Sequence, residues 1–188
     1  PASAPGAEGQ ARTLRLGWTA WGDADLVTRI AERLVERHFG IAVERTMADI
    51  GIQYQGVAAG DLDLMMMAWL PTTHRNYWDK VAGRVIDLGP LYSGWLGWAV
   101  PAYVPEAELA SLADLRRPAV RERLAGRIQG IDPGSGLMQA SQQALTAYGL
   151  DYRLVAASSA AMTAALDRAI RNRRWIVVTA WSPHWVFA

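Results

Sequence analysis

The apolar residues in the first half of this chain follow two different periods, which predict three strands separated by two helices. Apolar and polar residues alternate over Leu14–Trp18, which is typical of a strand. In the next segment an apolar residue recurs at every fourth position, at Leu26, Ile30 and Leu34, and these side chains would form the buried stripe of a helix. That helix would begin at a cap on Asp23 and end near residue 38. A strand over 41–45, a helix over 50–59 and a strand over 61–67 complete a β-α-β-α-β order, which is typical of a parallel sheet covered by helices.

The second half of the chain has the same style and predicts a second α/β lobe. Pro101 and Pro105 each fix their own φ and restrict the preceding residue, which favours a segment that crosses between lobes. An Arg-rich polar stretch up to Arg127 is predicted to be surface. The expected strands lie at 94–100, 128–131, 152–156 and 175–179, and the expected helices at 109–115, 137–148 and 159–172. We therefore expect a disordered leader over 1–12, a first lobe over 13–101, a crossing segment over 102–106 and a second lobe over 107–188.

Composition argues against several classes of protein. The 188 residues include 19 basic and 18 acidic ones, and a formal net charge of +1 argues against a nucleic-acid groove or a polybasic membrane patch. No apolar run reaches the ~18 residues needed to cross a bilayer. The absence of cysteine removes disulfides, thiolate metal sites and a lipid anchor on Cys. Residues 1–12, rich in Pro, Gly and Ala, look like the remnant of a cleaved secretory signal, with the flexible tail of a cytosolic protein as the alternative.

Tryptophan is unusually frequent, and its positions indicate a binding site. Nine Trp stand against two Phe, which is an inverted ratio for a plain core. In open α/β sheets, ligands collect beyond the carboxyl ends of the strands. Three predicted strands are followed shortly by a tryptophan: Trp21, Trp69 and Trp181. A fourth strand runs into a glycine-rich turn at 132–136, which leads into a predicted helix.

These four loops suit a small molecule that carries both charges. Each Trp face contributes roughly 0.5–2 kcal/mol toward a cation that cannot be hydrogen-bonded, such as a quaternary ammonium group. The backbone N–H groups of Gly136 and Leu137, with the helix dipole behind them, favour an anion by about 0.3–1 kcal/mol. His74 can add a further donor. Taken singly, a strand-end Trp is more often a core residue and a tight loop before a helix needs no ligand; what favours a site is that Trp recurs at the same loop position.

Catalytic and metal chemistry have weaker support. Ser135, Asp132 and His184 suggest a hydrolase triad, but the Gly-Ser-Gly around Ser135 lacks the G-x-S-x-G elbow. The three scattered histidines have no second ligand three or four positions away, which argues against zinc. We therefore expect no catalytic residue, no metal and no cofactor.

Four stretches of the chain resemble one protein family. They are 130–138 (GIDPGSGLM), 158–162 (SSAAM), 178–185 (VTAWSPHW) and 68–74 (AWLPTTH). By these motifs, the chain resembles the glycine betaine/proline betaine substrate-binding proteins of ABC importers. The resemblance spans both lobes, from about residue 14 to the end. It implies an α/β fold of the two-lobed, type II periplasmic-binding-protein kind, in which each lobe is a mainly parallel sheet with flanking helices.

The resemblance also implies a ligand site. An aromatic cage around the trimethylammonium group would consist of Trp21, Trp69 and Trp181. The carboxylate would be held by His74 and by the N–H groups of Gly136 and Leu137. With Trp21 and Trp69 in the first lobe and Trp181 in the second, the ligand would bridge the lobes and drive their closure.

The expected protein is a non-enzymatic, periplasmic monomer that delivers glycine betaine or a related betaine to a membrane-embedded ABC permease. It would bind no nucleic acid and would not insert into the membrane. A choline or carnitine binder of the same transporter class would keep the cage and relax the anion site. From other classes, an enzyme acting on betaine-like compounds and a pure interaction module remain alternatives.

The chain departs from the family pattern in two respects. Family members usually continue with a helical segment that returns to the first lobe, whereas this chain stops at Ala188. Trp95 and Trp98 also stand where smaller aliphatic residues are expected.

Overall fold

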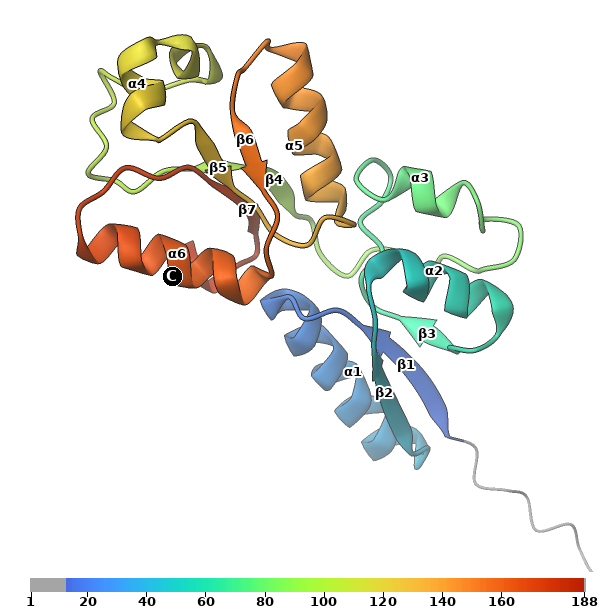
Figure 1. Ribbon diagram of the computed structural model, residues 1–188. Coiled ribbons are helices and arrows are strands. Elements are labelled where there is room, and N and C mark those ends of the chain that lie inside the picture. Colours follow the sequence, from blue (N-terminus) through green and yellow to red (C-terminus); the bar gives the residue numbers. More distant parts are fainter. Residues whose placement is uncertain (1–12, 188) are drawn as a thin grey trace, which may run out of the picture. The chain divides into compact units, whose positions relative to one another are not determined.

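The computed structural model describes residues 13–187, and the contacts between Cα atoms divide the chain into two compact units (Figure 1). Unit 1 holds the chain up to Ala68 together with Tyr77–Val85. Unit 2 holds Trp69–Asn76 together with the chain from Ile86 onward. The predicted leader over 1–12 lies outside the described residues. The division differs from the expected boundary at residue 101, because Trp69–Asn76 and the chain from Ile86 to that boundary group with the second half.

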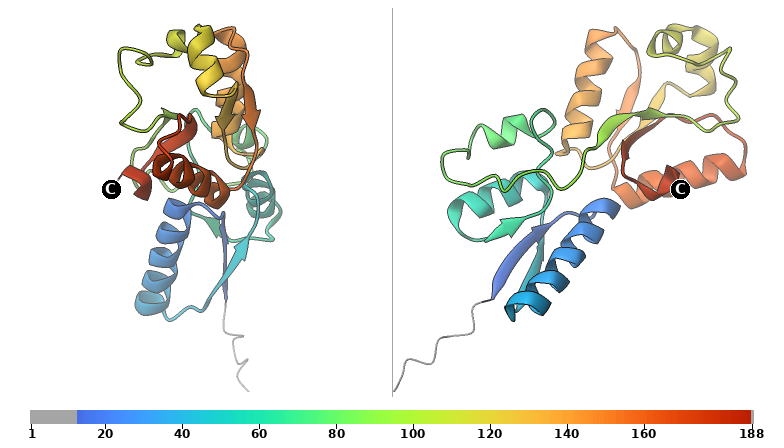
Figure 2. Two further views of the ribbon diagram at one scale, coloured as in Figure 1. Left: turned by 60° about the vertical axis from the view of Figure 1, so that its left-hand side comes forward. Right: turned by 180° about the vertical axis from the view of Figure 1, so that it is seen from behind.

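Unit 1 is a three-stranded parallel sheet with a helix on each face. β1 (Leu14–Trp18) lies between β2 (Val43–Met47) and β3 (Leu64–Met65), and α1 (Gly22–Phe39) and α2 (Ile50–Ala59) connect the strands. The two crossovers run in opposite directions across the sheet, so right-handed connections put the helices on opposite faces, as Figure 2 shows. The predicted β-α-β-α-β order is confirmed. β3 is shorter than the strand predicted over 61–67, because only Leu64 and Met65 pair with β1.

The buried face of α1 is not the predicted apolar stripe. Leu26, Ile30 and Leu34 are 60%, 50% and 49% exposed. The side chains that the helix buries are Asp23, Ala24, Thr28 and Ala31. Because most of these are small, the helix axis can approach β1 closely, and the large aliphatic side chains are left beside the contact rather than in it. Periodicity located the helix correctly but selected the wrong face.

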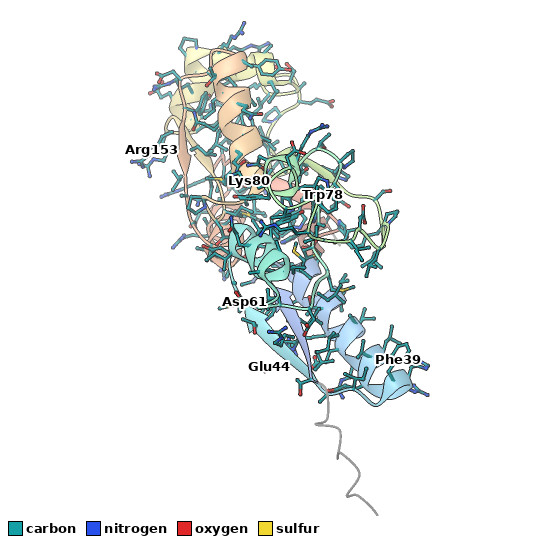
Figure 3. All side chains as sticks on the ribbon, turned by 90° about the vertical axis from the view of Figure 1, so that its right-hand side faces the viewer. Phe39, Glu44, Asp61, Trp78, Lys80 and Arg153 are labelled. Atoms are coloured by element: carbon teal, nitrogen blue, oxygen red, sulfur yellow. The ribbon has the colours of Figure 1, made fainter. Side chains whose placement is uncertain are left out.

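The start of α1 differs from the prediction, whereas its end agrees with it. Trp21 occupies the N-cap position without a side-chain cap bond, and Asp23 lies in the first turn, so the predicted cap on Asp23 is wrong. Gly40 ends the helix in the left-handed conformation, with φ of 64°, where glycine has no steric cost. Phe39, the last helical residue, is 72% exposed and projects from the helix end (Figure 3).

Unit 2 contains a four-stranded mixed sheet in the order β4-β7-β5-β6. β5 (Arg127–Gln129) is parallel to both β6 (Arg153–Val155) and β7 (Val178–Ser182). β4 (Trp95–Ala99) is antiparallel to β7, from Trp95 opposite Ser182 to Ala99 opposite Val178. The strand predicted over 94–100 therefore exists, but it completes the second sheet and not the first. At the other edge Arg153 of β6 projects away from the sheet (Figure 3).

Five helical segments accompany this sheet. They are η1 (Leu112–Arg116), α4 (Pro118–Arg123), α5 (Gly136–Ala147), α6 (Ser159–Arg171) and η2 (Trp185–Phe187). The hydroxyls of Ser135 and Ser158 accept the N–H groups of Met138 and Ala161, so serine caps start both long helices. The sequence prediction had taken α4 for a polar surface stretch. One buried hydrophobic cluster in the core of unit 2 consists of Leu115, Val120, Leu124, Ile128, Leu145, Leu150, Tyr152 and Val177.

A further short helix, α3 (Arg75–Trp78), contains the point at which the chain passes from Asn76 in unit 2 to Tyr77 in unit 1. In unit 1, Tyr77 stacks on Tyr54 of α2 with ring centroids 5.7 Å apart. Within residues 13–187, no helix combines the length and the apolar character needed to span a membrane.

The two sheets share one connectivity. The first parallel strand of each unit lies in the middle, flanked by the second and third, in the orders β2-β1-β3 and β6-β5-β7. The sequence Ala-Trp-x-Pro stands at the end of the third parallel strand of each unit. It follows β3 at 68–71, and at 180–183 it begins within β7 and runs one residue past it. Trp69 and Trp181 thus occupy equivalent places in the two halves of the topology.

Candidate functional site

The segment from Trp69 to His74 is a closed loop in which two predicted site residues bind each other. The backbone N–H of His74 donates to the carbonyl oxygen of Trp69 at 2.9 Å. The backbone N–H of Trp69 donates to Nδ1 of His74 at 3.1 Å. Because Nδ1 accepts this hydrogen bond, the neutral imidazole carries its proton on Nε2. His74 is 1% exposed, so its position is fixed by the loop.

The start of α5 presents the second group of predicted site residues. The Ser135 hydroxyl takes the N–H of Met138, which is one of the donors that a helix start leaves without an intrahelical partner. Among the described residues, no hydrogen bond joins the N–H groups of Gly136 or Leu137 to another residue. Both residues are buried. With the positive end of the helix dipole behind them, these two donors favour an anion.

The loop from Trp69 to Asn76 packs directly on this helix start. A Cβ atom at Gly136 would lie 2.4 Å from the carbonyl oxygen of Thr73 and 3.0 Å from Cδ2 of His74. Nδ2 of Asn76 donates to Oε1 of Gln139 at 2.7 Å. Trp69 and His74 were expected in the first lobe; these contacts group them with unit 2 instead. The structure therefore brings His74 and Gly136 together within one unit.

Trp181 is held in the sheet beside the same loop. It lies in β7 opposite Leu96 of β4, is 3% exposed, and meets the ring of His184 edge-on with centroids 4.4 Å apart. The next residue of β7, Ser182, lies near Trp69, and Gly94 borders both of them. A Cβ atom at Gly94 would lie 2.6 Å from the Ser182 carbonyl oxygen and 2.6 Å from Cη2 of Trp69. Unit 2 thus contains five of the six predicted site residues.

The sixth predicted residue, Trp21, belongs to unit 1. It follows β1, where its N–H donates to the Thr19 carbonyl at 2.8 Å and its carbonyl accepts the N–H of Asp25 at 2.9 Å. The Thr19 hydroxyl in turn accepts from Nε2 of Gln53 at 2.8 Å, and both of these side chains are buried. Trp21 is therefore held at the carboxyl end of β1 by backbone bonds on both sides.

The structure also accounts for the two tryptophans that the sequence left unexplained. Trp98 packs against the core of unit 2, and its Nε1–H donates to the Ser141 hydroxyl at 2.9 Å. A smaller aliphatic residue there would leave Ser141 without this partner. Trp95 is 49% exposed and packs on Phe187 at 5.3 Å between centroids. Within residues 13–187, neither Trp95 nor Trp98 forms a ring pair or a hydrogen bond with the loop from Trp69 to Asn76.

The groups considered for other chemistry have structural partners. Ser135 caps α5, and Nδ1 of His184 accepts the N–H of Val186 at 3.2 Å. Within residues 13–187, no group of three or more His, Cys, Asp or Glu side chains is placed to hold a metal ion. Sequence reasoning missed Gly94 and Tyr92, which border Trp69; the ring of Tyr92 meets that of Trp69 at 83° and 6.5 Å. No local pattern around residues 92–94 signals this role.

Comparison with known proteins gives consistent matches. The family described as the substrate-binding domain of ABC-type glycine betaine transport systems, OpuAC, matches residues 12–188. The crystal structure of lactococcal OpuAC, closed on glycine betaine, is 36% identical with a TM-score of 0.82, covering 94% of this chain and 67% of that one. The glycine betaine/L-proline-binding protein ProX from Borrelia burgdorferi is 32% identical with a TM-score of 0.86, covering 94% and 65%.

A curated relative, the glycine betaine/carnitine transport binding protein GbuC of Listeria monocytogenes, is 46% identical over 69 residues. That match covers 35% of this chain and 23% of the relative. The chain spans about two thirds of the length of the two solved structures. Both solved structures confirm the predicted α/β fold of the type II periplasmic-binding-protein kind.

Proposed function

This chain belongs to the family of substrate-binding domains of ABC-type glycine betaine transport systems, and from that premise we propose that it captures glycine betaine or a closely related betaine for an ABC importer. Family members and the structural relatives are transport proteins and not enzymes. In this proposal the chain works outside the cytoplasmic membrane, as a monomer, and hands its ligand to a membrane-embedded permease.

One observation carries the proposal: the loop that holds Trp69 also holds His74 against the start of α5. The Trp69 indole, the His74 imidazole and the first N–H groups of α5 thus belong to one packed assembly in unit 2, which supports a site for both charges. A zwitterion such as glycine betaine has its quaternary ammonium only a few bonds from its carboxylate. A site for it needs both chemistries within that short distance, which a single loop and helix start can provide.

The proposed cage consists of Trp21, Trp69 and Trp181. A quaternary ammonium group has no N–H to donate and is weakly held by water, so desolvating it onto indole faces is favourable, by roughly 0.5–2 kcal/mol for each face. Trp21 would come from unit 1 and the other two from unit 2. A ligand that uses residues of both units binds the closed form better than the open form, and that difference in affinity would drive closure.

The proposed carboxylate site consists of the Nε2–H of His74 and the N–H groups of Gly136 and Leu137. Hydrogen bonds to a charged group contribute about 1.5–3 kcal/mol each when formed in a protein site. This part of the site separates betaines, which carry a carboxylate, from choline, which does not. Proline betaine and carnitine also carry both charges, and the name of the Listeria relative makes carnitine the first alternative to test.

Isothermal titration of this 188-residue chain tests the proposal. We expect saturable binding of glycine betaine, weaker binding of choline, and none of glycine, which lacks the methyl groups that make the cation suit a cage. Carnitine and proline betaine would be titrated in the same series to rank the betaines.

The outcomes separate the alternatives. Tighter binding of choline than of glycine betaine would overturn the carboxylate site and indicate a choline-binding protein. Loss of the ligand during incubation, followed by NMR, would indicate an enzyme acting on betaine-like compounds. No binding of any quaternary ammonium compound to the folded chain would contradict the proposed function.

A further inference from the structure

Gly94, which directly precedes β4, borders both Ala-Trp-x-Pro segments. A Cβ atom at residue 94 would lie 2.6 Å from the Ser182 carbonyl oxygen, 2.6 Å from Cη2 of Trp69 and 2.8 Å from its Cζ3. Carbon atoms in ordinary contact are about 3.5–4.0 Å apart. Any side chain at residue 94 must therefore displace one of these groups.

The backbone conformation does not explain why this residue is glycine. The glycines with positive φ in the described chain are Gly40, Gly60, Gly89, Gly126 and Gly149. Gly94 is not one of them, so it lacks the left-handed conformation that most often requires glycine. The requirement at residue 94 is for space beside Trp69 and Ser182.

The two neighbours of Gly94 differ in how easily they can move. Ser182 ends β7 and lies opposite Trp95 in the antiparallel ladder, so its carbonyl position is set by the sheet. Trp69 lies in a loop, where Tyr92 meets its ring edge-on and His74 holds its backbone. A methyl group at residue 94 would push chiefly on the six-membered ring of Trp69.

We propose that Gly94 is a positioning residue for Trp69. Because Gly94 has no side chain, the indole of Trp69 can lie against the end of β7, the strand that carries Trp181. Gly94 thereby determines the position of one indole ring of the proposed cage. The binding consequence rests on the proposed function, whereas the contact itself does not depend on any ligand. Because the cage serves the quaternary ammonium group alone, betaine and choline should be affected alike.

The first test reads the contact without a ligand. In ¹H–¹⁵N spectra the indole N–H resonance of Trp69 is assigned from its absence in Trp69→Phe. Gly94→Ala should shift this resonance. The matched control is Gly97→Ala in β4, where a Cβ atom would meet only the ring of half-exposed Trp95, at 3.3 and 3.6 Å. A Trp69 resonance that stays in place in Gly94→Ala overturns the inference.

The second test reads binding, well below the thermal midpoint of every variant. Gly94→Ala should weaken glycine betaine and choline by a similar factor of about ten, the size expected for one misplaced indole face. Gly97→Ala should stay within about twofold of the parent chain, because the added methyl group would meet only the half-exposed ring of Trp95. Binding of both ligands at parental affinity overturns the inference, and so does a loss confined to betaine. If the parent chain binds neither ligand, the proposed function fails, while the spectra still decide the contact.

A double-mutant cycle separates positioning from general damage. If Gly94 acts through Trp69, the effect of Gly94→Ala on affinity and on the unfolding midpoint should shrink in a Trp69→Ala background. Additive losses would overturn the inference. Should Gly94→Ala alone fail to fold, recovery of folding in the double variant supports the contact, and continued failure overturns it.

Discussion

The two Ala-Trp-x-Pro segments hold their tryptophans in different ways. Trp181 is part of β7, pairs with Leu96 across the sheet and is 3% exposed. Trp69 lies beyond the end of β3, is only partly buried, and is held by His74 and by the segment around Gly94. A histidine follows each tryptophan and accepts a backbone N–H on Nδ1, from Trp69 in one segment and from Val186 in the other.

A tryptophan in a binding site can serve both the stability of the fold and the affinity for ligand, and the two segments differ in how far they combine these roles. A ring fixed in a sheet contributes to the fold whether or not a ligand is bound. A ring fixed by loop contacts contributes less to the fold, and small changes in its neighbours can move it. Stability and affinity should therefore respond differently to matched changes in the two segments.

The largest expected difference is in stability. Trp181→Ala should lower the free energy of unfolding by roughly 3–5 kcal/mol, the range for removing a buried Trp. Trp69→Ala should cost about half of that or less, because its ring buries less apolar area. Urea unfolding followed by circular dichroism measures both, with the two Trp→Phe variants as matched controls. Equal losses in the two alanine variants would contradict the comparison.

The two histidines should differ in ligand specificity. His74→Ala should weaken glycine betaine by about 1.5–3 kcal/mol through a lost hydrogen bond to a charged group. It should leave choline, which has no carboxylate, almost unchanged. His184→Ala is the matched control and should not discriminate between the two ligands. Titration of each variant with both ligands gives the answer, and equal losses of betaine and choline in His74→Ala would remove His74 from the anion site.

In affinity, by contrast, the two tryptophans should behave alike. Trp69→Ala and Trp181→Ala should each weaken glycine betaine by at least ~1 kcal/mol, because each removes one indole face from the proposed cage. The titrations should be run well below the unfolding midpoint of the less stable variant, which is expected to be Trp181→Ala. Parental affinity in both variants would exclude the cage.

The smallest expected effect is the dependence of the free energy of unfolding on pH in the acid range, which determines the pH at which the stability of the variants should be compared. The pKa of Asp114 is lowered from its ordinary value of 3.8 by the hydrogen bond from the Ser111 hydroxyl and by backbone N–H groups at the start of η1. A lowered pKa in the folded state stabilises the fold above the unfolded value, near pH 4, and this contribution is lost as pH falls through the folded pKa. Asp114→Asn should remove that acid dependence in unfolding curves. An unchanged acid slope would show that Asp114 is not its source.

Local features of this chain were predictable from sequence. α2 has its predicted bounds, α1 ends within a residue of its predicted end, and α6 starts at its predicted residue, because turn and cap chemistry depends on neighbouring residues. Trp21 and Trp69 follow their strands in loops, as predicted. The prediction for Trp181 is wrong, because the last strand runs over Val178–Ser182 and not over 175–179, so Trp181 pairs within β7 instead of following it. The alternation of strands and helices was enough to predict the α/β class.

Features that depend on distant residues could not be read from sequence. The helical period of α1 does not say which face meets the sheet, and the small side chains at Ala24, Thr28 and Ala31 were buried in place of the large ones. Nothing near β4 indicates that its partner is β7, so the strand was assigned to the wrong sheet. The role of Gly94 depends on Ser182 and Trp69, which are remote in sequence.

The placement of Trp69–Asn76 in unit 2 has a consequence for synthesis on the ribosome. All the strands and helices of unit 1 have been made once Val85 has emerged. The loop from Trp69 to Asn76 is made earlier than that, yet Gly94, Gly136 and Gln139, on which it packs, are made later. Domains generally fold as they emerge, N-terminal parts first. The nascent chain therefore completes the elements of unit 1 before the loop from Trp69 to Asn76 can make its contacts with α5. The proposed site can form only after those later residues have been made.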